Sequence, residues 1–138
     1  MYQCLKQLCQ QFNDVDISDE SIAICGLFHD ICKANTYKTG TRNVKDEETG
    51  KWYSKEIYEV DEKFPIGHGE KSCIILQWFL GKLSPQELLS IRWHMGGFDN
   101  AVKGGDFSLS KAYESSKLAA MLHIADMEAT YLMEEKNG

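Results

Sequence analysis

The chain has 138 residues, a length that suits one domain with a single hydrophobic core. Its 21 acidic and 15 basic residues give a net charge of −6, which argues against a dedicated binder of the nucleic-acid backbone. No apolar run approaches the ~20 residues that span a membrane, and the first residues lack the pattern of a signal peptide. We therefore expect a cytoplasmic protein without membrane partners. Its five cysteines include no Cys-x-x-Cys pair, so reduced, buried thiols are expected.

Two helices are predicted in the N-terminal region. Apolar residues with helical spacing indicate an amphipathic helix over residues 2–12. Ser18 is a good N-cap for the next helix, and two acidic residues follow it at the positive end of that helix. The second helix contains IAICGLFHDICK (22–33), which is apolar nearly all round and is therefore typical of a helix buried in a bundle.

Three polar residues near the end of this stretch, His29, Asp30 and Lys33, need partners if they are buried. An imidazole beside a carboxylate can bind a metal ion, and on a helix Lys33 lies about one turn beyond both. The alternative is an ordinary helix C-terminus, where His and Lys satisfy the last carbonyl groups. These three residues alone leave both interpretations open.

Helical spacing is lost between residues 35 and 65. Aromatic and β-branched residues within 41–60 predict an inserted β-hairpin, with Gly50 in its turn. A hairpin at this place could cover the polar residues as a lid or wall, or could be a solvated elaboration. The sequence favours neither.

Further helices are predicted toward the C-terminus. A helical run follows GHGEKS (67–72), and Ser-Pro-Gln-Glu (84–87) is a strong start signal for a helix that should stop at a Gly-Gly pair. Residues 98–107 are expected to be a loop, and an apolar stripe predicts one long last helix over 109–134. The predicted fold is all-α, a bundle of about five helices with one inserted β-hairpin.

Imidazole and acidic side chains occur at the predicted helix ends. His29, His68 and His94 each stand near the end of a helix, where separate helices of a bundle can converge on one point. Asp126 lies beside an otherwise apolar stripe, where a carboxylate is costly unless it meets a cation. His123 taken alone is better explained as a structural residue with a hydrogen-bond partner. We therefore expect the other polar residues to form one site.

Four motifs in this order resemble the HD-domain superfamily of metal-dependent phosphohydrolases: FHDICK (28–33), GHGEKS (67–72), IRWHMGG (91–97) and HIADMEA (123–129). The resemblance implies a single HD-type domain over residues 1–138. It implies that His29, Asp30 and Asp126 bind a divalent metal ion. It also implies that His68 and His94 bind a second metal ion or the substrate phosphate.

The chemistry of these donors agrees with the resemblance. Carboxylates and imidazoles suit Mn, Fe, Co, Ni, Zn or Mg, and such an ion can polarise a phosphoryl oxygen and lower the pKa of a bound water. Lys33, Arg92 and Lys71 are candidates for catalytic or phosphate-binding cations, although cations at helix ends are often solvated partners of the helix dipole. The expected function is hydrolysis of a small phosphate ester, with a nucleotide as one option.

One departure from the family pattern concerns the metal site. The pattern opens with a further His on the preceding helix, and here no His precedes His29. Either the chain is a shortened form of a longer protein, or the site has lost a ligand and binds a metal ion more weakly. The alternative function is a degenerate, non-catalytic module that binds a nucleotide or phosphate. A third hypothesis is a structural interaction domain in which the polar residues do not converge.

Overall fold

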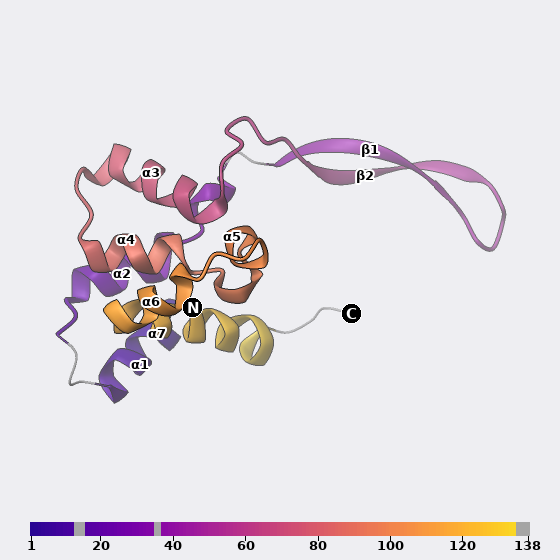
Figure 1. Ribbon diagram of the computed structural model, residues 1–138. Helices are drawn as coiled ribbons and strands as arrows, with labels where there is room; N and C mark the ends of the chain where they lie inside the picture. The colour runs from indigo at the N-terminus through magenta and orange to yellow at the C-terminus, as the bar shows by residue number, and fades with distance from the viewer. Residues whose placement is uncertain (13–15, 35–36, 135–138) are drawn as a thin grey trace. The chain divides into compact units, whose positions relative to one another are not determined.

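The structure is a computed structural model that describes residues 1–12, 16–34 and 37–134. The chain divides into two compact units (Figure 1), which we name by their secondary structure. The helical unit comprises Met1–Cys32 and Ile66–Gly138. The hairpin unit is Lys33–Pro65.

The hairpin unit shows that the predicted all-α class is wrong. Its strands β1 (Tyr37–Lys45) and β2 (Trp52–Val60) form a two-stranded antiparallel sheet, so the fold is mixed. The sheet begins at Tyr37, opposite Val60, rather than at residue 41. Aromatic and β-branched side chains favour the extended backbone over this whole length. Gly50 lies in the turn with φ of 70°, a backbone conformation that favours glycine.

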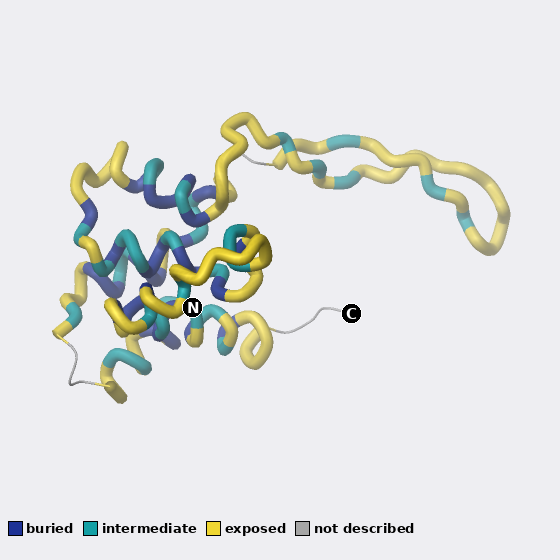
Figure 2. Tube along the Cα trace, in the orientation of Figure 1, coloured by how far each residue is buried: buried dark blue, intermediate teal, exposed yellow. Residues whose placement is uncertain are grey.

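No described residue between Lys33 and Pro65 is buried (Figure 2). Large aromatic side chains of the strands are exposed, with Tyr58 at 82% and Trp52 at 69%. The hydrophobic core is therefore built from the helical unit.

Two helices precede the hairpin: α1 (Tyr2–Gln11) and α2 (Asp19–Phe28). The predicted cap of α2 is confirmed, because Ser18 Oγ accepts a hydrogen bond from the Ser21 N–H at 3.1 Å. The helix ends at Phe28 and is followed by the short 3-10 turn η1 (Ile31–Lys33). Leu27 and Phe28 are 57% and 42% exposed, so α2 is buried on one side rather than all round.

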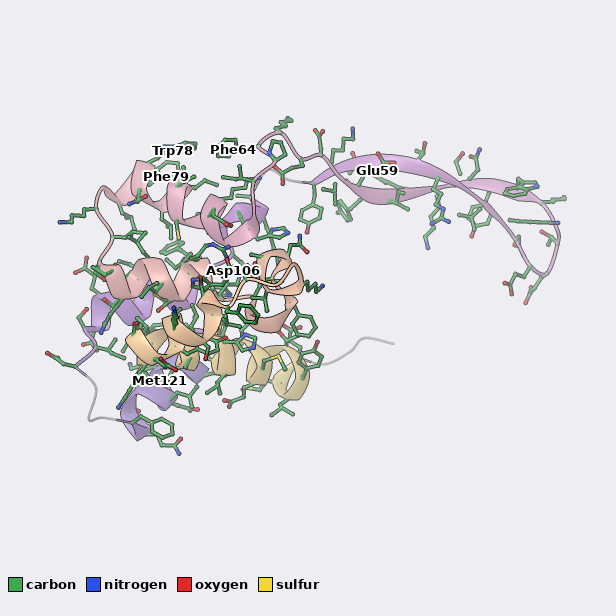
Figure 3. The ribbon with its side chains drawn as sticks, in the orientation of Figure 1. Glu59, Phe64, Trp78, Phe79, Asp106 and Met121 are labelled. Carbon is green, nitrogen blue, oxygen red and sulfur yellow. The ribbon has the colours of Figure 1, made fainter. Side chains whose placement is uncertain are left out.

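The middle helices are α3 (His68–Leu80) and α4 (Pro85–Arg92). The capping box predicted at the start of α4 is confirmed: Ser84 Oγ accepts from the Glu87 N–H at 3.2 Å, and the Glu87 side chain accepts from the Ser84 N–H. The C-cap of α4 is Trp93, so the helix ends before the Gly-Gly pair that was expected to stop it. Trp78 and Phe79 project from α3 and are exposed (Figure 3).

The C-terminal region is more broken than predicted. The expected loop over residues 98–107 begins at the last residue of the 3-10 turn η2 (Gly96–Phe98) and contains the short helix α5 (Asn100–Lys103). The expected long helix is divided into α6 (Ser108–Ser115) and α7 (Lys117–Glu128), and the π-helical turn η3 (Ala129–Met133) follows. The break occurs because Ser116 is extended, with φ of −141°, and its hydroxyl caps α7. The described residues thus form seven α-helices rather than about five.

Helix α7 is central to the helical unit and packs against α1, α4 and α6, while α3 packs against α4. Leu5 of α1, Ile91 of α4 and Leu122 of α7 are fully buried in the core. All five cysteines are free, as the sequence predicted. Four of them are buried, and Cys9 is partly buried.

Candidate functional site

Four residues selected from the sequence lie together in the helical unit: His29, Asp30, His94 and Asp126. We call them the central cluster. His94 Nε2 is 3.0 Å from Asp30 Oδ1. His29 Nε2 is 3.5 Å from Asp30 Oδ2 and 3.9 Å from Asp126 Oδ1. The two imidazole rings meet edge to face, with centroids 5.1 Å apart.

The packing of three helices brings this cluster together. His29 is the C-cap of α2, and Asp30 follows it directly. His94 lies just beyond the end of α4, and Asp126 is on α7. Because α4 packs against both α2 and α7, the end of α2, the end of α4 and the side of α7 meet at one place.

The backbone orients both imidazoles of the cluster. His29 Nδ1 is 3.0 Å from the Cys25 carbonyl oxygen, and His94 Nδ1 is 2.6 Å from that of Ile91. A carbonyl oxygen only accepts, so each Nδ1 is the protonated nitrogen. In the neutral imidazoles each Nε2 is then a lone pair directed at carboxylate oxygens, an arrangement common among histidines that ligate metals. A lone pair facing a carboxylate is unfavourable unless a cation lies between them or the nitrogen carries a proton.

The cluster is closed on its imidazole side and open on its carboxylate side. The side chains of His29 and His94 are 7% and 0% exposed, whereas those of Asp30 and Asp126 are 36% and 32% exposed. Burial is the largest influence on the pKa of His29 and lowers it, while the two carboxylates act in the opposite direction. The lowered pKa favours an unprotonated Nε2 at neutral pH. A small cation would reach the cluster from the carboxylate side.

The donor atoms suit a divalent ion in pairs. Two donors that bind one ion at about 2.1 Å are roughly 3.0–4.2 Å apart for bond angles of about 90–180°. The separations of 3.0, 3.5 and 3.9 Å in the cluster all fall within this range. However, in the part of the chain that the structure describes, no three His, Cys, Asp or Glu side chains together could hold a metal ion as they stand. Each pair of donors has a suitable separation, but the donors do not point at one common position. Asp30 directs Oδ1 to His94 and Oδ2 to His29, so its two contacts use different oxygen atoms. The donor chemistry therefore fits, and a shared site needs other rotamers of the two carboxylates.

Three predicted site residues lie elsewhere. His68 is the first residue of α3, is exposed, and its Nδ1 is 3.6 Å from Cys32 Sγ rather than within the central cluster. Lys71 is buried in α3, with 6% of its surface exposed. Lys33 is exposed and belongs to the hairpin unit. The roles assigned to these three side chains stay predictions.

Arg92, the remaining candidate cation, is held by two carboxylates. Its Nη1 donates to Asp99 Oδ2 and its Nη2 donates to Glu70 Oε1, both at 2.8 Å. The guanidinium carbon also lies 3.9 Å from the centroid of the Trp93 ring. Two ion pairs and one stacking contact fix the plane of the guanidinium. The charge of Arg92 is thus balanced within the protein.

The Glu70–Arg92–Asp99 bridge lines a cavity of about 410 Å³, which we call the side cavity. His68, Met95 and Phe98 also line it. Met95 directly follows His94 of the central cluster. His68 contacts Cys32, which follows Asp30 by two positions. The side cavity therefore adjoins the chain segments that carry the cluster.

Sequence reasoning did not identify Glu70 or Asp99. Asp99 is the N-cap of α5, and its Oδ1 accepts from the Ala101 N–H at 2.8 Å, so a capping signal was available. Glu70 lies inside the GHGEKS motif, but its pairing with Arg92 joins two helices and has no local signal. His123 does have the hydrogen-bond partner that was predicted for it, because its Nδ1 donates to the His94 carbonyl oxygen at 3.0 Å.

Neither a protein-family model, nor a curated protein, nor a solved structure matches this chain significantly. Among the described residues, no helix is both long and apolar enough to cross a membrane. Function is therefore inferred from the geometry of the central cluster and from the motifs of the sequence.

Proposed function

We propose that this protein is a metal-dependent phosphohydrolase that cleaves a small phosphate ester in the cytoplasm. The observation that carries the proposal is the convergence of two buried imidazoles and two partly exposed carboxylates, with separations of 3.0–3.9 Å. Such mixed nitrogen and oxygen donors suit first-row divalent ions. The ordered motifs that resemble the HD-domain superfamily support the same function.

The residues of the central cluster have distinct roles in this proposal. His29, Asp30 and Asp126 hold a divalent ion, which when bound supplies Lewis acidity to a phosphoryl oxygen and to a water molecule. Asp30 contacts both imidazoles and so sets their relative position. His94 has its Nδ1 proton committed to the Ile91 carbonyl, so its Nε2 lone pair is left to bind a second ion, and Nε2 would contact the phosphate only when it also carries a proton.

The overall reaction adds water across the bond between phosphorus and the ester oxygen. It releases inorganic phosphate and an alcohol, and the leaving oxygen takes up a proton. His29 and His94 are buried, and Asp30 and Asp126 are open to solvent, so the substrate phosphate would approach from the carboxylate side.

Phosphate release tests the proposal. Protein stripped of metal and then supplied with Mn²⁺, Co²⁺ or Ni²⁺ should release inorganic phosphate from a panel of phosphate esters. His29→Ala and Asp126→Asn should each lower the rate at least ~100-fold, because even residues that only orient metal ligands cost 10–100-fold when changed. Asp106→Asn is the matched control, since Asp106 is an exposed residue outside the cluster. Equal rates in the wild type and Asp126→Asn would refute the proposal.

Metal content gives a readout that does not depend on turnover. Elemental analysis after dialysis should find stoichiometric metal in the wild type and less in Asp126→Asn. Protein that binds no metal but still binds a nucleotide would instead support the non-catalytic module predicted as the alternative.

A further inference from the structure

The side cavity carries the opposite charge from that of a phosphate site. Its charged lining residues are one guanidinium and two carboxylates, Arg92 with Glu70 and Asp99, which leaves a formal charge of −1. A phosphate group entering the cavity would meet both carboxylates and a guanidinium that is already paired. The cavity is therefore suited to an uncharged or cationic group.

The polar wall of the cavity offers hydrogen-bond acceptors in fixed positions. Asp99 is held by the Arg92 guanidinium and by the Ala101 N–H, and its side chain is only 9% exposed. The Glu70 side chain is 44% exposed, and its Oε1 is held by Arg92. A carboxylate accepts about four hydrogen bonds, so both groups retain lone pairs after these contacts. A ligand with N–H donors would satisfy them.

The remaining wall of the cavity is apolar and aromatic. Phe98 lies at the end of η2, lines the cavity, and is 54% exposed. Met95 lines the same cavity and offers a polarisable thioether. A flat heterocycle can stack on a phenylalanine ring and contact such a thioether at the same time. The volume of about 410 Å³ lies within the range of small-molecule sites.

Two residues that line the side cavity lie next to the chain segments that carry the central cluster. Met95 is the residue next to His94, and His68 of the cavity contacts Cys32, close in sequence to Asp30. A phosphate ester with its phosphate at the cluster could thus place the other part of the molecule in the side cavity.

We propose, on the basis of the function proposed above, that the side cavity binds the leaving group of the substrate and that this group is a nucleoside whose base carries an exocyclic amino group. The amino group donates to Glu70 or Asp99, and the base stacks on Phe98. Adenine, cytosine and guanine carry such an amino group, whereas thymine and uracil present carbonyl oxygens there. The substrates are then nucleoside monophosphates of the first three bases.

Binding of nucleosides without phosphate tests the cavity independently of catalysis. Calorimetric titration of the wild type should give a Kd for deoxyadenosine at least ~10-fold below that for thymidine, because thymine lacks the exocyclic amino donor and would present a carbonyl oxygen to the carboxylates. Phe98→Ala should raise the Kd for deoxyadenosine at least ~10-fold through loss of stacking. Phe107→Ala is the matched control, because Phe107 is 85% exposed and does not line the cavity. Equal affinity for the two nucleosides, or unchanged affinity in Phe98→Ala, would overturn the proposal.

A second substitution tests the role of the Glu70 carboxylate in the cavity wall. Glu70→Gln keeps the shape of the side chain, removes its charge and removes one acceptor, so the preference for deoxyadenosine over thymidine should fall several-fold. The control is Glu114→Gln, an exposed substitution on α6 outside the cavity, which should leave the preference unchanged. An unchanged preference in Glu70→Gln would count against the assigned role of the wall.

Kinetics separate this proposal from the proposed function. For deoxyadenosine monophosphate, Phe98→Ala should raise KM with little change in kcat. For p-nitrophenyl phosphate, which has no base, the same substitution should leave KM unchanged. If no phosphate ester is hydrolysed but deoxyadenosine binds selectively, the proposed function fails and the cavity assignment stands. If esters are hydrolysed without regard to the base and no nucleoside binds, the proposed function stands and the cavity assignment fails.

Discussion

The close approach of α3 to α4 leads to a strong prediction about Gly69. A Cβ at Gly69 would lie 2.0 Å from the Arg92 carbonyl oxygen, 2.7 Å from its carbonyl carbon and 2.9 Å from its Cα. Ordinary contact begins at 3.4 Å, and these are backbone atoms of α4 that cannot rotate away. The two helices would have to separate by more than 1 Å at this point, and overpacking of this kind typically costs ~1–3 kcal/mol, occasionally more.

Helix propensity acts in the opposite direction, since alanine in place of a helical glycine gains only about 0.5–1 kcal/mol. We therefore expect Gly69→Ala to lower the free energy of unfolding by about 2 kcal/mol. Urea denaturation followed by circular dichroism measures this change. Gly97→Ala is the matched control, because a Cβ there meets nothing within 4 Å, and its stability should change by no more than about 0.5 kcal/mol. A Gly69→Ala protein as stable as the wild type would refute the packing argument.

Two further predictions concern caps and thiols. Ser84→Ala should cost about 1 kcal/mol of unfolding free energy through loss of the hydrogen bond from the Glu87 N–H, whereas exposed Ser110→Ala should be nearly neutral in the same urea assay. Burial raises the pKa of Cys25 to about 12 and that of Cys73 to about 11, from 9.0. The unfolded thiols ionise first as the pH rises above 9, so stability should fall by about 1.4 kcal/mol per pH unit for each thiol up to its folded pKa. Urea unfolding at pH 8 and pH 10 should therefore differ more in the wild type than in Cys25→Ala, and an equal difference in both proteins would contradict the assigned burial.

Features set by neighbouring residues could be predicted from the sequence. Ser18 and Ser84 cap helices where expected, because a cap depends on a side chain and backbone N–H groups only a few residues away. Gly50 marks the hairpin turn for a similar local reason, since its φ of 70° favours a residue without a side chain.

Features set by tertiary contacts were predicted less well. The last helix was expected to be continuous because its apolar stripe passes through Ser116 without interruption, but there the backbone is extended and the hydroxyl begins α7 instead. The end of α4 was predicted at the Gly-Gly pair, but the helix already ends at Arg92. The guanidinium of Arg92 forms ion pairs with Glu70 and Asp99. Periodicity shows which residues face the core, but it does not reveal the residue at which the backbone leaves the helical conformation.

The central cluster was accessible from the sequence because it consists of polar residues in apolar surroundings, which is a costly arrangement without partners. His29, Asp30 and Asp126 were selected on that basis together with the family resemblance, and the structure places the His29 imidazole within 4 Å of each of the two carboxylates. The side cavity was not accessible in this way. Glu70 and Asp99 occur in polar segments, where acidic residues are common and carry no signal of their long-range pairing.

The geometry of the cluster depends on a residue that lies beside it. His123 donates from Nδ1 to the His94 carbonyl oxygen at 3.0 Å, and its ring lies so close to Gly96 that a Cβ there would be 2.4 Å from a ring atom. The backbone from His94 to Gly96 is thereby held against α7, and Gly96 permits this with φ of 55°. Asp126 lies about one turn beyond His123 on the same helix. One helix therefore fixes the backbone of an imidazole donor and supplies a carboxylate donor, which gives HIADMEA (123–129) a physical reason to carry both residues.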